Sequence, residues 1–447
     1  MSLLFPDSPL YQRESCKIHF IGCAGKGTCP LAKIFLQKGF SVSGSDLLDT
    51  PDLQVLRDAG AVIHIGHSAE NLPDDDGKKL FVVHSSAISP DNPELVEARR
   101  RGADVLLRGE ALALLARCYK RVISISGSHG KTSITSMVVF LLSELGMKPG
   151  YLIGDFMVGR RGMNGDCGGS DDLFVSEVDE SDGTHTAIAS YLGIVPNVED
   201  DHSWSVGGVE QLEQNFQSYA SHAKKLIFAD TPVTMRLFAS HPDHESVLCT
   251  SEHPFLQYLD RDVTSCWGIF QKMNALLAMK AVVFLGIAPE MAGKILSKFP
   301  GVERRMSVRF HDEKYVLIED YAHHPTELHA SLSAIREIYT DRRLVVVFQP
   351  HRYARLNRYF NRFVEELHAA DCVFVAPVFA AWTGDGKLDS TDLVKSIGDS
   401  AEIVPQNWNI AVERVFRKIH KGDVIAVIGA GDVNSLIPLL VNRLTFA

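Results

Sequence analysis

The sequence predicts an α/β protein built from three α/β domains. Its 447 residues repeat one pattern, in which a short apolar segment is followed by a polar or glycine-containing turn and then by a stretch of helical periodicity. The pattern occurs in three successive sets along the chain. Alternation of strands and helices is typical of parallel sheets that are covered by helices on both faces. Three such sets therefore predict three sheets.

The first set lies in residues 1–107, which we expect to form one domain. A helix is predicted at 92–101, before the last strand of the set. The expected strands are KIHFIG, SVSG, AVIHIG, LFVVHSS and DVLL, at 17–22, 41–44, 61–66, 80–86 and 104–107.

The other two sets predict a central domain at 108–298 and a C-terminal domain at 299–447. The central strands are expected to be RVISIS, LFVSEV, LGIVPN and KLIFAD, with helices at 131–145, 208–224 and 271–286. The C-terminal strands are expected to be VLIED, RLVVVFQ, CVFVAP and DVIAVIG.

The composition argues against several classes of protein. Hydrophobic residues make up 45% of the chain and charged residues 22%, and the formal net charge is −10. Such a chain lacks the basic surface that nucleic-acid binding requires, and its apolar runs, such as 279–288, are far shorter than the roughly 20 residues that span a bilayer. Residues 1–15 lack the basic region of a signal peptide, and the cysteine spacing favours neither disulfides nor zinc. We expect a cytoplasmic enzyme.

A glycine-rich loop follows the first strand of the central set. The text VISISGSHGKTS joins an apolar strand to a predicted helix, and its glycines allow backbone N–H groups to turn toward a phosphate. Lys131 would reach the β- and γ-phosphates, and the Thr132 hydroxyl would bind Mg²⁺. The loop is shorter than the usual Walker pattern, so a solvated strand-to-helix turn is the alternative. The candidate phosphate-binding residues are Gly127, Ser128, His129, Gly130, Lys131, Thr132 and Ser133.

Two further strands of the central set end in acidic residues. The segment FVSEVDESDG carries Glu177, Asp179, Glu180 and Asp182, and IVPNVEDDHSW carries His202 after its acids. Each could be a solvated loop. Beside a phosphate loop, the carboxylates become candidate Mg²⁺ ligands, because ligands of open α/β sheets bind at the carboxyl ends of strands.

The first domain also opens with a glycine turn after a strand. Gly22, Gly25 and Gly27 lie in IHFIGCAGKGTCP, and Asp46 ends the next strand in SGSD. A nucleoside diphosphate would suit this loop, with Asp46 accepting a hydrogen bond from a ribose. The glycine order differs from that of the dinucleotide fingerprint, so this signal is weak by itself.

Together these motifs resemble the Mur ligase family, the ATP-dependent amide-forming enzymes of peptidoglycan synthesis. The matching text runs through nearly the whole chain, and the segments HHPTE and FQPHRY are the most diagnostic. The other matching segments are IHFIGCAGKG, SGSD, SSAI, DNPE, GSHGKTS, EVDESD, NVEDDH, GVERR, DYAHHPTE, FQPHRYAR and GAGDV. The similarity is greatest to the branch of the family that adds L-alanine to UDP-N-acetylmuramate.

The resemblance implies a fold and a reaction. It implies a Rossmann-like UDP-binding domain, a central ATPase-like domain and a Rossmann-like C-terminal domain that binds the amino acid. The lactyl carboxylate of UDP-N-acetylmuramate would be phosphorylated by ATP, and L-alanine would attack the acyl phosphate. The expected cofactors are ATP and Mg²⁺, the partners are small-molecule substrates, and a monomer or weak homodimer is expected.

The resemblance also implies roles for individual residues. The catalytic residues would be Lys131, Glu177, His202 and His324, and the Mg²⁺ ligands would be Thr132, Glu177 and His202. ATP would also contact Asn274, Arg305 and Asp320. The UDP-sugar would contact Gly22, Gly25, Gly27, Asp46, Ser85 and Ser86. The amino acid would lie among Tyr321, His351, Arg352 and Arg355.

Some features depart from the family pattern or leave alternatives open. Phe270 and Gln271 replace a histidine and an asparagine in the usual motif that ends at Asn274, which puts the adenine contacts in doubt. The absence of lysine between 203 and 223 agrees with the alanine-adding branch. The alternatives are a ligase of the same fold that adds a preformed tripeptide, a UDP-sugar-binding regulator without catalysis, and a simple phosphate-loop kinase or NTPase.

Overall fold

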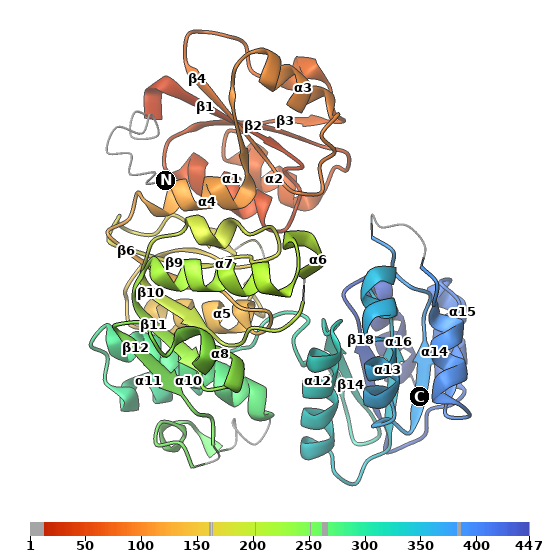
Figure 1. Ribbon diagram of the computed structural model, residues 1–447. Coiled ribbons are helices and arrows are strands. Elements are labelled where there is room, and N and C mark those ends of the chain that lie inside the picture. The colour runs from red at the N-terminus through yellow and green to blue at the C-terminus, as the bar shows by residue number, and fades with distance from the viewer. Residues whose placement is uncertain are drawn as a thin grey trace. The chain divides into compact units, whose positions relative to one another are not determined.

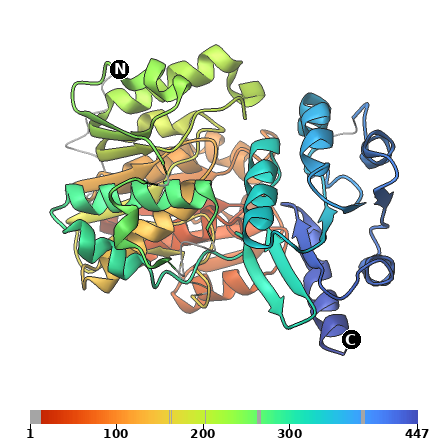
Figure 2. The same cartoon turned by 90° about the horizontal axis from the view of Figure 1, so that it is seen from below.

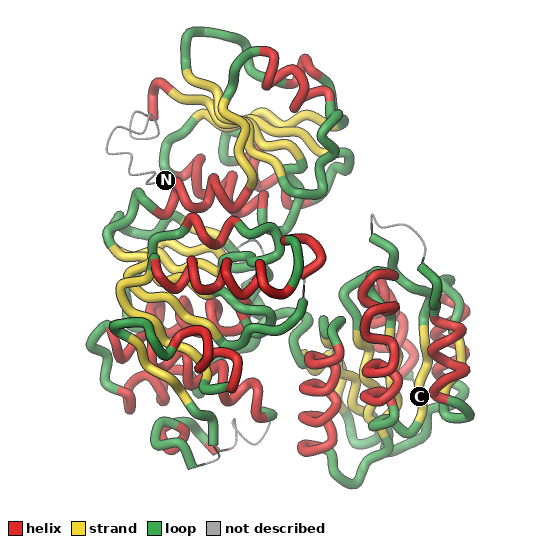
Figure 3. The backbone as a smooth tube through the Cα atoms, viewed as in Figure 1, coloured by secondary structure: helices red, strands yellow, loops and turns green. Residues whose placement is uncertain are grey.

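The computed structural model describes residues 13–160, 162, 164–201, 203–250, 252–261, 267–381 and 386–446. Contacts divide the chain into two compact units (Figure 1). The first unit contains Met1–Leu259 and Met273–Pro300, and the second contains Asp260–Lys272 and Gly301–Ala447. Within these described ranges the chain forms three β-sheets, which confirms the predicted fold class (Figure 3).

The first sheet is fully parallel and has the strand order β3-β2-β1-β4-β5. Its strands are β1 (Cys16–Ile21), β2 (Ser41–Asp46), β3 (Val62–Ile65), β4 (Lys79–His84) and β5 (Asp104–Leu107). Its helices are α1 (Thr28–Gln37), α2 (Pro51–Asp58), α3 (Pro93–Arg100) and α4 (Arg108–Ala116), with short 3₁₀ turns at Arg13–Ser15 and Ala69–Asn71. Alternate residues of β1 explain the two covered faces, because Ile18 and Phe20 pack with α1, α2 and α4, whereas Ile21 packs with α3.

The second sheet has the order β12-β11-β10-β6-β9-β7-β8. Its strands are β6 (Arg121–Ile125), β7 (Gly150–Leu152), β8 (Gly165–Asp166), β9 (Leu173–Glu177), β10 (Ser190–Val195), β11 (Ala223–Ala229) and β12 (His244–Val247). Its helices are α5 (Lys131–Glu144), α6 (Ser203–Val206), α7 (Val209–Ser221), α8 (Pro232–Phe238), α10 (Ile269–Phe284) and α11 (Pro289–Leu296), with 3₁₀ turns at Thr184–Ala187 and Leu256–Tyr258. Strand β8 pairs with β7 in the antiparallel direction, which corrects the expectation of a purely parallel sheet.

The third sheet forms the core of the second unit and has the order β13-β14-β18-β15-β16-β17. Its strands are β13 (Ser307–His311), β14 (Val316–Asp320), β15 (Leu344–Phe348), β16 (Cys372–Val375), β17 (Ala401–Ile403) and β18 (Val424–Ile428). Its helices are α12 (Pro325–Ile338), α13 (Tyr353–Leu367), α14 (Ser390–Ile397), α15 (Trp408–Phe416) and α16 (Leu436–Thr445), with a 3₁₀ turn at Asp432–Ser435. Edge strand β13 is antiparallel to β14.

Helices cover both faces of this third sheet (Figures 1 and 2). In β15, Val346 and Phe348 belong to a core that contains residues of α12, α13 and α14, and Val345 and Val347 belong to a core with α15 and α16. Burial on both sides explains why this strand is apolar at every position.

The first two sheets share one hydrophobic core within the first unit. This core contains Phe20 and Phe35 from the first sheet and its helices, together with Phe174 and Phe216 from the second. Because this core is continuous, it gives no clear boundary between two domains near residues 107 and 108. The predicted domain boundaries therefore stay predictions. Among the described residues, no helix is long and apolar enough to cross a membrane.

Candidate functional site

The predicted phosphate loop lies in the first unit, where it joins β6 to α5 and requires both of its glycines. Gly130 precedes α5 with a φ of +88°, and a Cβ atom there would lie 2.7 Å from Asn274 Oδ1. A Cβ atom on Gly127 would lie 2.9 Å from the carbonyl oxygen of Asn197. The loop is therefore a specific close-packed turn, and it brings the predicted nucleotide-binding residue Asn274 beside the helix N-terminus, where N–H groups attract phosphate.

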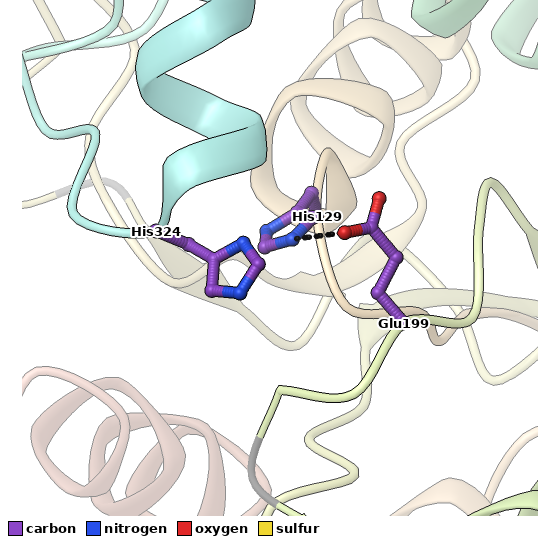
Figure 4. Close-up of side chains that lie close together, drawn as sticks. All are labelled: His129, Glu199 and His324. Atoms are coloured by element: carbon purple, nitrogen blue, oxygen red, sulfur yellow. Dashed lines mark ion pairs between the residues drawn. The ribbon is translucent and has the colours of Figure 1, made fainter. Parts of the chain in front are cut away.

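A second segment, which follows β10, holds this loop in place. Asn197 Oδ1 accepts a hydrogen bond from His129 N at 2.8 Å, and Asn197 Nδ2 donates to His129 O at 3.0 Å. Ser128 Oγ accepts from Glu199 N at 2.8 Å. The His129 ring also lies 3.6 Å from a Glu199 carboxylate oxygen (Figure 4). These contacts fix the loop backbone through groups of the protein itself, and sequence reasoning did not identify Asn197 as a residue that does so.

Lys131 begins α5 and turns back over the loop. Its ammonium donates to Gly127 O at 2.5 Å and to Glu180 Oε2 at 2.8 Å. Burial by itself would lower the pKa of Lys131, but the carboxylates of Glu180 and Asp179 raise it above its usual range. Lys131 therefore carries a fixed positive charge at the place where the motif predicts phosphate.

Glu177 and Thr132 together offer oxygen ligands for a divalent cation. Burial raises the pKa of Glu177, while a hydrogen bond from Thr132 opposes that rise. The buried Glu177 Oε2 atom has no hydrogen-bond partner among the residues that the structure describes. A hydroxyl beside a buried carboxylate oxygen fits Mg²⁺, which prefers such ligands. The third predicted ligand, His202, lies outside the described residues.

Near these acids lies a histidine that sequence reasoning did not single out. His185 is fully buried in the 3₁₀ turn after the acidic segment, and neither ring nitrogen has a hydrogen-bond partner among the described residues. Burial lowers its pKa to about 4, so the ring is neutral near pH 7. Its ring packs against Phe216 at 5.1 Å between centroids. The surrounding sequence, GTH, matches no motif that would have indicated a functional role for His185.

The glycine turn of the first domain is fastened by Asp46. Its Oδ2 atom accepts from Ala24 N at 2.8 Å and its Oδ1 atom accepts from Leu48 N at 3.1 Å. Gly22 has a φ of +76°, which favours glycine. Asp46 thus shapes the turn itself, and its predicted ribose contact stays a prediction, as do the roles of Ser85 and Ser86, which follow β4.

A hollow lies beside this turn in the first unit. It is bordered by Lys26, Lys33, Gly154, Asp155 and Asn164, and Lys26 Nζ lies 2.8 Å from Asp155 Oδ2. Lys26 belongs to the first glycine turn, and the backbone of Gly154 donates a hydrogen bond to the candidate cation ligand Glu177. The hollow therefore lies next to both features.

In the second unit, the residues expected to contact ATP surround the end of β14. Asp320 is buried and accepts from Met306 N at 2.6 Å and from Ala322 N at 2.8 Å. The Arg305 guanidinium lies 5.0 Å from the centroid of the Tyr321 ring. His324 is buried at the start of α12, where its Nδ1 atom accepts from Thr326 N. Asp320 therefore organises two loops at this sheet edge.

Three of the four predicted amino-acid-binding residues, His351, Arg352 and Arg355, follow β15, whereas Tyr321 follows β14. Arg355 is only 1% exposed and lies 3.2 Å from His351 Nδ1, and the His351 ring is stacked on Phe379 at 5.7 Å. Arg352 has a φ of +66°, which is rare for a residue with a side chain. The other described non-glycine residues with positive φ also belong to this unit, and they are Arg304, Met306 and Ala381. Strained backbone of this kind concentrates at functional sites.

Comparisons with known proteins agree with these motifs. The family model "Mur ligase family, catalytic domain" matches residues 17–120, and "Mur ligase, glutamate ligase domain" matches residues 304–431. The chain is 34% identical to the UDP-N-acetylmuramate–L-alanine ligase of Thermobifida fusca, over 99% of this chain and 100% of the relative. It is also 34% identical to the Aquifex aeolicus enzyme of the same name, over 94% and 95% of the two chains.

A solved structure supports the same assignment. The UDP-N-acetylmuramate–alanine ligase MurC of Thermotoga maritima superposes with a TM-score of 0.76 at 26% identity, over 96% of this chain and 99% of that one. Relatives of this identity over nearly the whole length, together with the phosphate loop and the arginine cluster, assign the family. The chain belongs to the Mur ligase family.

Proposed function

We propose that this Mur ligase joins L-alanine to the lactyl carboxylate of UDP-N-acetylmuramate and converts ATP to ADP and phosphate. The proposal is carried by the curated relatives, which are named for this reaction and match the chain from end to end. It is supported by the arrangement of Lys131, Thr132 and Glu177 around the phosphate loop.

The reaction requires two anions to approach each other. A carboxylate oxygen of the sugar attacks the γ-phosphorus of ATP, the bond to ADP breaks, and an acyl phosphate forms. The amine of L-alanine then attacks the acyl carbon, loses a proton and expels inorganic phosphate. Lys131 and the N–H groups at the start of α5 would bind the γ-phosphate and reduce this repulsion.

Thr132 and Glu177 are the residues that would hold Mg²⁺, together with His202. A bound Mg²⁺ neutralises phosphate charge and polarises the phosphoryl oxygens. Asn274, Arg305, Asp320 and His324 complete the proposed nucleotide contacts. The UDP-sugar contacts at the first glycine turn are proposed from the same motifs.

The acceptor site is proposed in the second unit. Arg352 and Arg355 would bind the α-carboxylate of L-alanine, because a guanidinium makes two parallel hydrogen bonds to a carboxylate. His351 and Tyr321 would shape the remainder of the site, and the stacking of His351 on Phe379 supports a rigid wall there.

An ADP-release assay tests this proposal. Purified protein is incubated with Mg²⁺-ATP, UDP-N-acetylmuramate and one acceptor at a time: L-alanine, glycine, L-serine or the tripeptide L-Ala-γ-D-Glu-diaminopimelate. We expect turnover to be fastest with L-alanine and to need the UDP-sugar. Preference for the tripeptide would replace the proposal with the recycling alternative. ADP release without UDP-sugar would indicate an NTPase, and sugar binding without any turnover would indicate a regulator.

A further inference from the structure

The Lys131 ammonium already has a complete set of partners inside the protein. It donates to Gly127 O at 2.5 Å and to Glu180 Oε2 at 2.8 Å, and Ser128 O lies at 3.4 Å. An ammonium has three N–H donors. A triphosphate can therefore bind Lys131 only if at least one of these contacts weakens.

Glu180 is the charged member of this set. Its side chain is fully buried, and its second oxygen, Oε1, has no hydrogen-bond partner among the described residues. Burial raises the pKa of Glu180 to about 7, which reflects the cost of keeping a carboxylate in this position. Within the described part of the chain, Lys131 is the only cation that forms an ion pair with Glu180, and little solvent screens the attraction between the two charges.

The other acids of the segment differ from Glu180. Asp179 pairs with Arg108 at 3.3 Å, and Asp182 accepts hydrogen bonds from the backbone and side chain of Thr184. Glu177 receives a hydrogen bond from Thr132. Of the four acids in this segment, Glu180 is therefore the one that directly contacts Lys131. The proposed reaction assigns no role to it.

We propose that Glu180 is a positioning residue that competes with the nucleotide phosphates for the Lys131 ammonium and recovers the ammonium when ADP leaves. The inference rests on the proposed function of the phosphate loop. In this structure, the contact with Glu180 keeps Lys131 folded over the loop. When a triphosphate binds, the Lys131 ammonium moves toward the phosphates. Because Glu180 still attracts the ammonium, it lowers the affinity of the enzyme for the product ADP.

The main test is Glu180→Gln, which keeps the shape of the side chain and removes its charge. Removing the competitor should lower the Kd for ADP roughly tenfold, which is near the lower end of what one hydrogen bond to a charged group contributes. The KM for ATP and kcat should both fall, because product release becomes slower. A purely structural role would instead raise KM or lower the melting temperature. ADP binding is measured by calorimetry on the full chain, and kinetics by ADP release.

A double-mutant cycle with Lys131→Met locates the effect. Without the ammonium there is no competition, so Glu180→Gln should then tighten ADP binding by only about twofold, through reduced repulsion between the carboxylate and phosphate. Glu180→Asp keeps the charge but is one methylene shorter. Its affinity for ADP should lie between those of the wild type and Glu180→Gln.

The outcomes separate this inference from the proposed function. If the wild type binds ADP and Glu180→Gln binds it equally or more weakly, the inference is wrong and the proposed function stands. An equal gain in both Lys131 backgrounds would also overturn it. If the wild type binds no ADP, both proposals fail. If Glu180→Gln does not fold, the test uses Glu180→Asp instead. ADP binding to Glu180→Asp that is weaker than ADP binding to the wild type would then overturn the inference.

Discussion

Single residues in the proposed acceptor site combine a strained backbone with a buried charge. Arg352 adopts a left-handed φ of +66° directly before α13, and the guanidinium of Arg355 is buried beside His351. A guanidinium can make two parallel hydrogen bonds to a carboxylate, so these arginines suit the α-carboxylate of an amino acid. Strained backbone of the kind seen at Arg352 is concentrated at functional sites.

We expect Arg352→Ala and Arg355→Ala to raise the KM for L-alanine by roughly one to two decades, because each removes a charge-assisted hydrogen bond of about 1.5–3 kcal/mol. The KM for ATP should change little. Lysine at either position should restore only part of the affinity, since an ammonium cannot make the two-pronged contact. Steady-state kinetics with L-alanine as the varied substrate check this, and melting curves control for the buried position of Arg355. An unchanged KM for L-alanine in both variants would place the acceptor site elsewhere.

The sequence predicted some of these residues and missed others for a physical reason. Lys131 and Thr132 follow directly from the short text GKT, whose chemistry is local. Asn197 was missed, and Glu180 was predicted only as a candidate Mg²⁺ ligand, because these residues contact partners 68 and 49 positions away along the chain. Such contacts depend on which strands are neighbours, and the order of strands cannot be read from the pattern of one segment.

At the scale of whole elements, the buried parallel strands were predicted, as were the edge strands β3 and β5 of the first sheet, whereas the edge strands β8 and β13 were not. A strand such as β15 is apolar at every position because both of its faces are covered. Strand β8 contains only Gly165 and Asp166, and β13 reads SVRFH with most of its side chains partly or fully exposed. These edge strands bury little, so the sequence carries no strong apolar pattern for them.

Helix α3 begins with a buried polar network on one face of the first sheet. Glu94, in its first turn, accepts from Asn71 Nδ2 at 2.6 Å and from Ser45 Oγ at 2.5 Å, and His19 Nε2 lies at 3.4 Å. Burial by itself would raise the pKa of Glu94, but these contacts lower it to about 2 from an ordinary value of 4.5. The network therefore stabilises the ionised carboxylate and joins α3 to strands β1 and β2.

This network should make stability depend on pH in a defined window. Because the folded-state pKa lies below the unfolded value, Glu94 stabilises the fold above about pH 4.5, and the contribution is lost as the pH falls from 4.5 toward 2. At pH 7, Glu94→Gln should lower the free energy of unfolding by an amount on the order of 3 kcal/mol, and the difference should shrink below pH 4.5.

Urea unfolding of the wild type and Glu94→Gln between pH 3 and pH 7 measures this effect. Glu97→Gln is the matched control, since Glu97 lies on the same helix but pairs with Arg100 and Arg101 at the surface. Its effect should be much smaller because surface ion pairs contribute little. A constant difference between the wild type and Glu94→Gln at every pH would mean that the charge of Glu94 is not what stabilises the network.

At the scale of the whole molecule, the sequence predicted three sheets but not the common core of the first two. Helix α1 contributes to that core and also makes polar contacts with the second sheet and its loops. Lys33 Nζ donates to Gly162 O at 3.2 Å, and Gln37 Oε1 accepts from Cys167 N at 2.8 Å. The packing of α1 against the second sheet depends on the shapes of two folded surfaces. The hydrophobic periodicity of the sequence does not describe those shapes.

The shared core raises the question of whether the two proposed nucleotide sites are energetically separate. The first glycine turn follows β1, and the phosphate loop follows β6 in a different sheet. Each loop is fastened by its own residues, Asp46 in one case and Asn197 in the other. Effects of substitutions that share no partners usually add independently. We therefore expect the two sites to bind their ligands separately despite the common core.

Lys131→Ala tests this separation. Ligation should fall by roughly 10²–10³-fold or more, because the charge that stabilises the transferring phosphoryl group is lost. The Kd for UDP-N-acetylmuramate should stay within about twofold of the wild-type value. Asp46→Ala is the reciprocal variant: it should weaken UDP-sugar binding and leave the Kd for ADP nearly unchanged.

Two controls are needed because Lys131→Ala leaves Glu180 without its cation. Melting curves are recorded for each variant, and the double variant Lys131→Met with Glu180→Gln is measured alongside. Comparable loss of UDP-sugar affinity in a folded Lys131 variant would show that the two sites are coupled through the shared core, and the assignment of the two nucleotides to separate sheets would then be wrong.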